Sequence, residues 1–183
     1  KTLSKGGSFA DIGCGFGHST TMIAEQFSQS SVRGIDPHEQ SIHEAQKIAE
    51  QKNLNNLTYE IASAENYSGE YDIISFFDCL HDMGDPVAAV SYAKTKLKSG
   101  GALMIIEPYA NDEVSENFNI IGQMYYSFST IACVPASKSQ KGGMALGAQA
   151  GLKKLTNVLN NGGFSKVEMT YKTASNMVIE ARV

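Results

Sequence analysis

The sequence predicts a doubly wound α/β fold, in which a mostly parallel sheet of seven strands carries helices on both faces. Three observations predict it. Short apolar segments alternate with segments of helical periodicity, as in repeated strand–helix–strand units. A glycine-rich turn, residues 13–17, follows the first apolar segment, and Asp36 ends the second. Residues 71–77 form a nearly continuous apolar run, which is typical of a central parallel strand.

Seven segments have the composition of strands. The expected strands are residues 8–13, 32–35, 57–61, 71–77, 102–106, 165–171 and 176–182. The last two are joined by so short a connection that they are expected to be antiparallel, whereas the earlier ones are separated by helices and are expected to be parallel.

Four segments have apolar residues at helical spacing. The expected helices are residues 18–28, 39–52, 86–97 and 149–160. In the second of them Ile42, Ala45, Ile48 and Ala49 fall on one face, which we expect to be buried. Pro86 suits the first turn of the third helix, and the Ser-Gly-Gly run at residues 99–101 is expected to break it.

Bulk properties exclude several classes of protein. A length of 183 residues predicts one domain, residues 1–183. A net charge of −4 argues against binding of nucleic acid through this domain, and no apolar run is long enough to predict a membrane partner. Cys14, Cys79 and Cys133 form no CxxC pair, so we expect reduced thiols, a cytoplasmic location and no metal site.

The glycine-rich turn separates two classes of cofactor. A dinucleotide-binding turn has the spacing GxGxxG. Here the third residue after Gly15 is His18, so the turn is GxGxG instead, preceded by Asp11. Glycine allows the backbone to turn sharply and to approach a ligand closely, and a carboxylate at Asp36 could accept both hydroxyls of a ribose. A tight glycine turn with no ligand is the alternative.

This pattern resembles the first motif of the class I S-adenosylmethionine-dependent methyltransferases. The resemblance implies a Rossmann-like methyltransferase fold with S-adenosylmethionine as cofactor. It also implies that Asp36 holds the ribose and that Asp11 shapes the loop. The glycines expected beneath the methionine part of the cofactor are Gly13, Gly15 and Gly17.

The same resemblance assigns further positions around the cofactor. Pro37 and His38 would lie along the adenine, although His38 could equally be an exposed residue at the start of a helix. Ala64 and Glu65 resemble the motif that meets the adenine edge, with a plain surface acid as the alternative for Glu65. Phe77 ends the fourth strand, where the family contacts the methionine backbone atoms.

Residues 77–86, Phe-Asp-Cys-Leu-His-Asp-Met-Gly-Asp-Pro, indicate the class of acceptor. They resemble the LHDWxD-like segment of small-molecule O-methyltransferases, in which the histidine is the general base. The resemblance makes His81 the base and Glu107 the acid that orients it. The [DN]PP[YF] sequence of nucleic-acid amino methyltransferases does not occur here, which argues against base N-methylation. A phenol has a pKa of about 10, so it needs a base near pH 7.

The match departs from the family at two positions. The second acid that these enzymes carry before their last helix has no counterpart in residues 146–151, and Met83 replaces the usual tryptophan. His81 could therefore fill the crevice without chemistry, and the chain could be a cofactor-binding sensor or regulator without turnover. A nicotinamide-dependent oxidoreductase is a third class, which the glycine spacing disfavours.

A resemblance over most of the chain points to bacterial methyltransferase domains that follow an N-terminal winged-helix-like segment. The segments that show this resemblance are residues 77–86, 125–126, 133–137 and 145–151. Because the chain begins at Lys1, close to its first strand, we expect such a segment to precede it; in these proteins it helps form a homodimer and encloses the substrate. Residues 111–150 would be a lid whose Met, Tyr and Phe side chains either line an apolar acceptor pocket or cover the sheet edge.

Overall fold

The structure, a computed structural model, describes residues 2–183. Its seven strands form one sheet, as the sequence predicts, and their order in the sheet is β3-β2-β1-β4-β5-β7-β6. By their contacts the residues fall into two compact units. The first holds the chain up to Phe77 together with Thr95–Leu103, and the second holds Asp78–Lys94 and Met104–Val183.

Four parallel strands build the first unit. They are β1 (Ser8–Ile12), β2 (Ser31–Asp36), β3 (Leu57–Ile61) and β4 (Tyr71–Phe77). β1 lies between β2 and β4, and β3 pairs with the other side of β2. Phe9, Ile12, Ile35, Ile74 and Phe76 are fully buried and form the core here. Parallel pairing brings the carboxyl ends of these strands to the same edge, where ligands of open α/β sheets bind.

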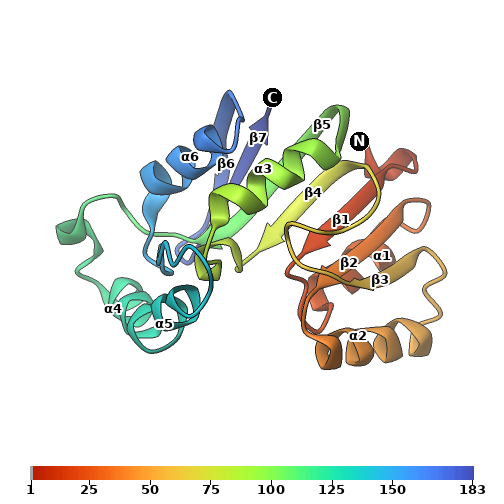
Figure 1. Cartoon of the computed structure of the whole chain (residues 1–183), viewed down its shortest axis with the longest axis horizontal. Helices are drawn as coiled ribbons and strands as arrows, with labels where there is room; N and C mark the ends of the chain where they lie inside the picture. The colour runs from red at the N-terminus through yellow and green to blue at the C-terminus, as the bar shows by residue number, and fades with distance from the viewer. Residues whose placement is uncertain (1) are drawn as a thin grey trace. The chain divides into compact units, whose positions relative to one another are not determined.

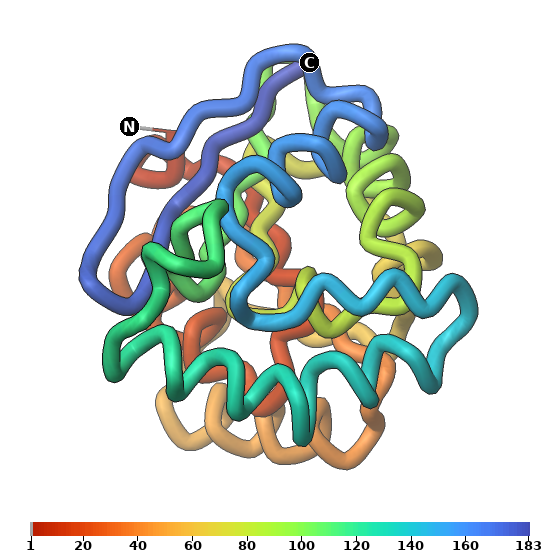
Figure 2. Tube along the Cα trace, turned by 90° about the vertical axis from the view of Figure 1, so that its left-hand side faces the viewer, coloured from red at the N-terminus to blue at the C-terminus, as the bar shows by residue number. Residues whose placement is uncertain are grey.

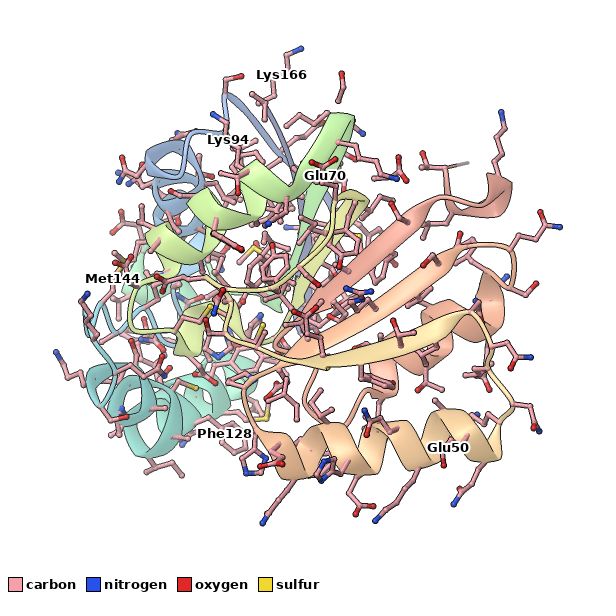
Figure 3. The ribbon with its side chains drawn as sticks, turned by 45° about the vertical axis from the view of Figure 1, so that its right-hand side comes forward. Glu50, Glu70, Lys94, Phe128, Met144 and Lys166 are labelled. Carbon is pink, nitrogen blue, oxygen red and sulfur yellow. The ribbon has the colours of Figure 1, made fainter. Side chains whose placement is uncertain are left out.

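Two helices complete the first unit. α1 (His18–Gln26) and α2 (Glu39–Gln51) pack against each other and against β2 and β3, and Figure 1 shows α2 running alongside β3. α2 buries Ile42, Ala45 and Ala49 as the periodicity predicts, whereas Ile48 on the same face is only partly buried. Figure 3 shows Glu50 in the last turn of α2. Helical spacing therefore identified the buried face of α2.

The second unit contains the C-terminal strands. β6 (Lys166–Lys172) and β7 (Asn176–Arg182) are antiparallel, which confirms the prediction, and α6 (Gly151–Asn161) packs against β6. The chain crosses from one unit to the other within α3 (Pro86–Lys96) and within β5 (Leu97–Pro108). η2 (Leu80–Asp82), a 3-10 turn, precedes α3.

Residues 111–150 contain helices that the sequence does not predict. η3 (Val114–Asn117) leads into α4 (Ile120–Phe128), a π-helical turn η4 (Ser129–Cys133) and α5 (Val134–Lys138). Figure 2 shows residues 120–138 as one helical run, with the following residues returning alongside it. Figure 3 places Phe128 on this run and Met144 on the returning segment, both about half exposed. Because several large apolar side chains of the run are exposed, its periodicity did not indicate a helix.

The predicted start of the fifth strand is wrong. Residues 99–101 were expected to lie in a break after the third helix, with the next strand at 102–106, but β5 begins at Leu97. The ammonium group of Lys98 binds Ser8 Oγ at 2.8 Å and Asp72 Oδ2 at 3.1 Å. These partners are remote in sequence, so local propensity could not reveal them. None of the helices within residues 2–183 has the length and apolar character needed to cross a membrane.

Candidate functional site

The glycine loop of the first unit, residues 13–17, turns over the end of β2. The amides of Gly13 and Cys14 donate to the Ile35 carbonyl at 2.8 and 3.1 Å. Gly15 and Gly17 have φ of 52° and 70°, in the left-handed region that favours glycine. A Cβ on Gly17 would lie 2.2 Å from the Tyr59 hydroxyl, whereas one on Gly15 would meet nothing within 4 Å. Gly17 is therefore fixed by packing, and Gly15 leaves open space for a ligand.

Tyr59, which the sequence analysis did not identify, supports this loop from β3. Its hydroxyl lies 3.4 Å from the Gly17 carbonyl and 3.3 Å from the hydroxyl of Thr21. A Cβ on Gly34 would lie 2.5 Å from the Tyr59 ring. Gly34 is a glycine inside a strand, a signal of close approach by another group. That signal could have drawn attention to the neighbouring strand.

Asp36 lies beside the loop at the end of β2. Its Oδ2 accepts a hydrogen bond from the Gly15 amide and its Oδ1 accepts one from the His38 amide, both at 2.8 Å. An ionised carboxylate has about four acceptor sites. About two remain, which suits the two hydroxyls of a ribose.

Asp11 lies beneath the loop and is fully buried. Its Oδ2 accepts hydrogen bonds from Thr20 Oγ1 at 2.7 Å and Ser19 Oγ at 2.8 Å, and its Oδ1 accepts one from Ser75 Oγ at 3.3 Å. Burial raises the pKa of Asp11 to about 6; the three hydroxyls oppose the rise and the charge of Asp36 adds to it. Asp11 thus ties β1, β4 and the start of α1 together under the loop.

The remaining expected cofactor positions lie at the ends of strands. Pro37 is exposed, and His38 is the N-cap of α2, where its Nδ1 accepts from a backbone amide. His38 therefore has the helix-start role that was one of its two interpretations. Ala64 is partly buried and Glu65 exposed after β3, and Phe77, half-buried, ends β4. Their roles toward a cofactor stay predictions.

In the second unit His81 and Glu107 form a buried pair. They are 4% and 1% exposed. His81 Nδ1 is hydrogen-bonded to Glu107 Oε2, and the Leu80 amide donates to Glu107 Oε1 at 3.0 Å. Burial alone would lower the pKa of His81, but the hydrogen bond and charge of Glu107 outweigh it and raise that pKa above its ordinary value. The histidine is thus held in one orientation by a charged partner.

The segment around His81 is tied to the helical run of residues 120–138. Ser137 Oγ donates to the Met83 carbonyl at 2.7 Å. The Gln140 side chain accepts from the Gly84 amide at 3.0 Å and donates to the Asp82 carbonyl at 2.9 Å. Sequence reasoning missed Ser137 and Gln140 because their partners are more than 50 residues away.

An open groove of about 580 Å³ lies along η3 and the following α4. Val114, Phe118, Ile120 and Tyr126 supply its apolar lining. Phe118 and Ile120 are more than 80% exposed. Neither member of the buried His–Glu pair is among its lining residues, so an acceptor pocket formed by residues 111–150 stays a prediction.

Known proteins resemble this chain in both sequence and structure. A family model described as a methyltransferase domain matches residues 3–163. The chain is 30% identical over 121 residues to the ubiquinone biosynthesis O-methyltransferase of Acinetobacter baylyi, covering 63% of this chain and 49% of the relative.

Solved structures agree on the fold. An O-methyltransferase family protein from Burkholderia thailandensis has a TM-score of 0.75 at 16% identity, over all of this chain and 53% of its own. The O-methyltransferase NcsB1 from neocarzinostatin biosynthesis, solved with S-adenosyl-L-homocysteine and 1,4-dihydroxy-2-naphthoic acid, also has a TM-score of 0.75, at 17% identity over 100% of this chain and 51% of its own.

These matches define the class of protein. The fold is that of the class I S-adenosylmethionine-dependent methyltransferases, and the chain belongs to the methyltransferase-domain family. It spans about half the length of the curated relatives that it matches.

Proposed function

We propose that this chain binds S-adenosylmethionine through the first unit and catalyses transfer of its methyl group to a hydroxyl of a small molecule. The observation that best supports this reaction is the buried His81–Glu107 pair. His81 lies four residues after the end of β4 along the chain. Membership of the methyltransferase-domain family and an O-methyltransferase among the curated relatives support it.

The first unit fits the cofactor on two counts. Asp36 keeps acceptor sites beyond its two backbone amides, and the space beyond Gly15 is open. Gly13 and Gly17 complete the turn, with Pro37, Ala64, Glu65 and Phe77 proposed at its periphery. When bound, the cofactor supplies a methyl group on a positively charged sulfur.

The second unit supplies the base. Overall, one carbon–oxygen bond forms and one carbon–sulfur bond breaks, and the hydroxyl proton must leave the acceptor. Neutral His81 accepts this proton at Nε2, because Nδ1 is bound to Glu107. The Glu107 carboxylate stabilises the imidazolium that results and keeps the ring in place.

The class of acceptor follows from charge and chemistry. A net charge of −4 disfavours nucleic acid, and a structural neighbour was solved with a dihydroxynaphthoic acid. A small, apolar or aromatic hydroxyl compound is the class that we infer. None of the three cysteines, all within the described residues, forms a disulfide, which fits a reducing cytoplasm.

Calorimetric titration tests the cofactor. The chain is expected to bind S-adenosylmethionine and S-adenosylhomocysteine saturably and NADH not at all. Asp36→Ala should weaken binding at least tenfold because the ribose hydroxyls lose their acceptor, whereas Glu65→Ala, at an exposed position, should change affinity less. Binding of NADH alone would overturn the cofactor assignment, and unchanged affinity in Asp36→Ala would overturn the ribose contact.

Methyl transfer to a panel of phenols and catechols tests the base. His81→Gln should slow transfer by roughly a hundredfold, as for loss of a general base, and should leave cofactor affinity near that of the wild type. Full activity in this variant would remove His81 from the mechanism.

A sensor without turnover is the second candidate. The observation that favours it is Gln149, in the segment where the O-methyltransferases carry a second acid; its amide oxygen is hydrogen-bonded to Ser129. Cofactor binding with no transfer to any hydroxyl of the panel, in the wild type, would favour the sensor over the enzyme.

A further inference from the structure

Three potential metal ligands converge beside the buried pair. His81 and Asp82 come from η2, and Cys133 ends the π-helical turn η4. One ligand atom from each side chain, an imidazole nitrogen, a carboxylate oxygen and the thiol sulfur, lies within 4.8 Å of the other two. His81 and Cys133 are buried, and the Asp82 side chain is 42% exposed. Single π-helical turns occur frequently at functional sites.

His81 already has the hydrogen bonding of a metal-binding histidine. Its Nδ1 is bound to the Glu107 carboxylate, which leaves Nε2 as the nitrogen that faces Asp82. A histidine that binds a metal almost always donates its other ring N–H to a carboxylate, a carbonyl or water. The His81–Glu107 geometry therefore suits a metal ligand as well as a base.

Asp82 supplies a second, independent indication. Its Oδ1 is buried and has no hydrogen-bond partner, yet it lies 3.3 Å from Nε2 of His81. In the neutral imidazole both atoms are acceptors, and two acceptors at this distance repel each other unless a proton or a cation lies between them. The orphaned oxygen thus points to a positive charge at this position.

The spacing fits a tetrahedral ion. Zinc bonds of about 2.0–2.1 Å to nitrogen and about 2.0–2.2 Å to oxygen place those two ligand atoms about 3.4 Å apart. The observed separation is 3.3 Å. By the same geometry the Cys133 sulfur would lie about 3.6 Å from the nitrogen. The two atoms now lie within 4.8 Å of each other, so the sulfur would move closer by about 1.2 Å at most.

We propose that His81 Nε2, Asp82 and Cys133 bind a divalent transition-metal cation of the zinc type, with a fourth position open. This departs from the expectation from sequence that the chain has no metal site. The bound cation would occupy the lone pair on Nε2, so it would inhibit methyl transfer. The binding itself is independent of the function proposed above, and only the inhibition rests on it.

Cobalt provides a spectroscopic test that needs no activity. The 183-residue chain, freed of metal by a chelator, is titrated with Co²⁺ and then with Zn²⁺. The expected result is one equivalent of Co²⁺ with the visible bands of a tetrahedral site and a near-ultraviolet thiolate-to-cobalt band, both lost on adding Zn²⁺. Cys133→Ser should abolish the thiolate band, and Asp82→Asn should weaken binding at least tenfold.

Matched cysteine variants test which thiol binds the metal. Cys79→Ser and Cys14→Ser should keep the thiolate band, and circular dichroism verifies that Cys133→Ser is folded. The absence of any thiolate band, or a band unchanged in Cys133→Ser, would overturn the metal site and leave a protonated His81 facing Asp82.

Where methyl transfer is measurable, Zn²⁺ should inhibit the wild type, whereas Cys133→Ser should keep its activity and resist Zn²⁺. Metal binding without inhibition of methyl transfer would overturn the proposed inhibition and would leave the metal site in place.

Discussion

The two units each contain a buried carboxylate, and these differ in their partners. Asp11 in the first unit and Glu107 in the second are 0% and 1% exposed. Asp11 is surrounded by the hydroxyls of Ser19, Thr20 and Ser75. Glu107 is bound by a backbone amide and by the imidazole of His81.

The difference in partners separates a framework acid from a reactive one. A hydroxyl can donate a hydrogen bond but does not take up a proton near neutral pH, so the partners of Asp11 cannot relay a proton, and Asp11 connects strands and helix. Imidazole titrates near neutral pH, so the pair in the second unit can take up a proton. Burial alone therefore does not identify a functional carboxylate; the chemistry of its partner does.

The largest expected effect concerns Asp11. Burial raises its pKa from 3.8 to about 6, so between these values the folded chain binds a proton that the unfolded chain has lost. The resulting stabilisation is fully present below the unfolded pKa and disappears as pH rises through 6. A shift of this size corresponds to about 3 kcal/mol. Relative to Asp11→Asn, the wild-type free energy of unfolding should fall by up to that amount between pH 4 and 8.

Urea unfolding at several pH values measures this difference. Asp36→Asn, at the partly exposed carboxylate beside the same loop, is the matched comparison. It removes the smaller, charge-based part of the pKa rise while leaving Asp11 buried, so its stability should still fall between pH 4 and 8, by somewhat less than in the wild type. Parallel stability curves for the wild type and Asp11→Asn would show that Asp11 stays ionised between pH 4 and 8. A buried, ionised Asp11 would then need a cation or a water molecule beside it.

The sequence predicted the first unit well because its interactions are short in range. The glycine turn, Asp11 and Asp36 lie within 26 residues and are placed by consecutive strand ends. Parallel topology then brings those ends to the same edge of the sheet. The left-handed φ of Gly15 and Gly17 is a local property that glycine favours, whereas the packing of Tyr59 against Gly17 comes from a distant strand and was not predicted.

The second unit was predicted only in part. His81 and Glu107 were identified through a resemblance, and the structure pairs them across 26 residues. Cys133 lies 52 residues from His81 and was interpreted only as a reduced thiol. Its approach depends on the fold of residues 111–150, whose helices expose apolar side chains and so lack the periodicity of a buried face. Contacts of this kind depend on tertiary packing, which local pattern does not encode.

A smaller effect, in the second unit, tests the reactive half of the comparison. His81 must be neutral to accept a proton, so the rate of transfer should rise with pH through the pKa of His81, which Glu107 holds above its ordinary value. Glu107→Gln removes that charge. The rise in kcat/KM should then move to lower pH, and the plateau should fall about tenfold because the imidazolium is less stabilised.

The pH profile separates this role from a structural one. Loss of folding would reduce the rate at every pH without moving its midpoint, and thermal unfolding of the variant measures that loss directly. Glu113→Gln, at an exposed position of the same unit, is the control and should leave the profile unchanged. If the midpoint stays fixed in Glu107→Gln, another group titrates in the reaction. Asp11 and Glu107 would then both have a structural role alone, and the difference between their partners would have no consequence for the reaction.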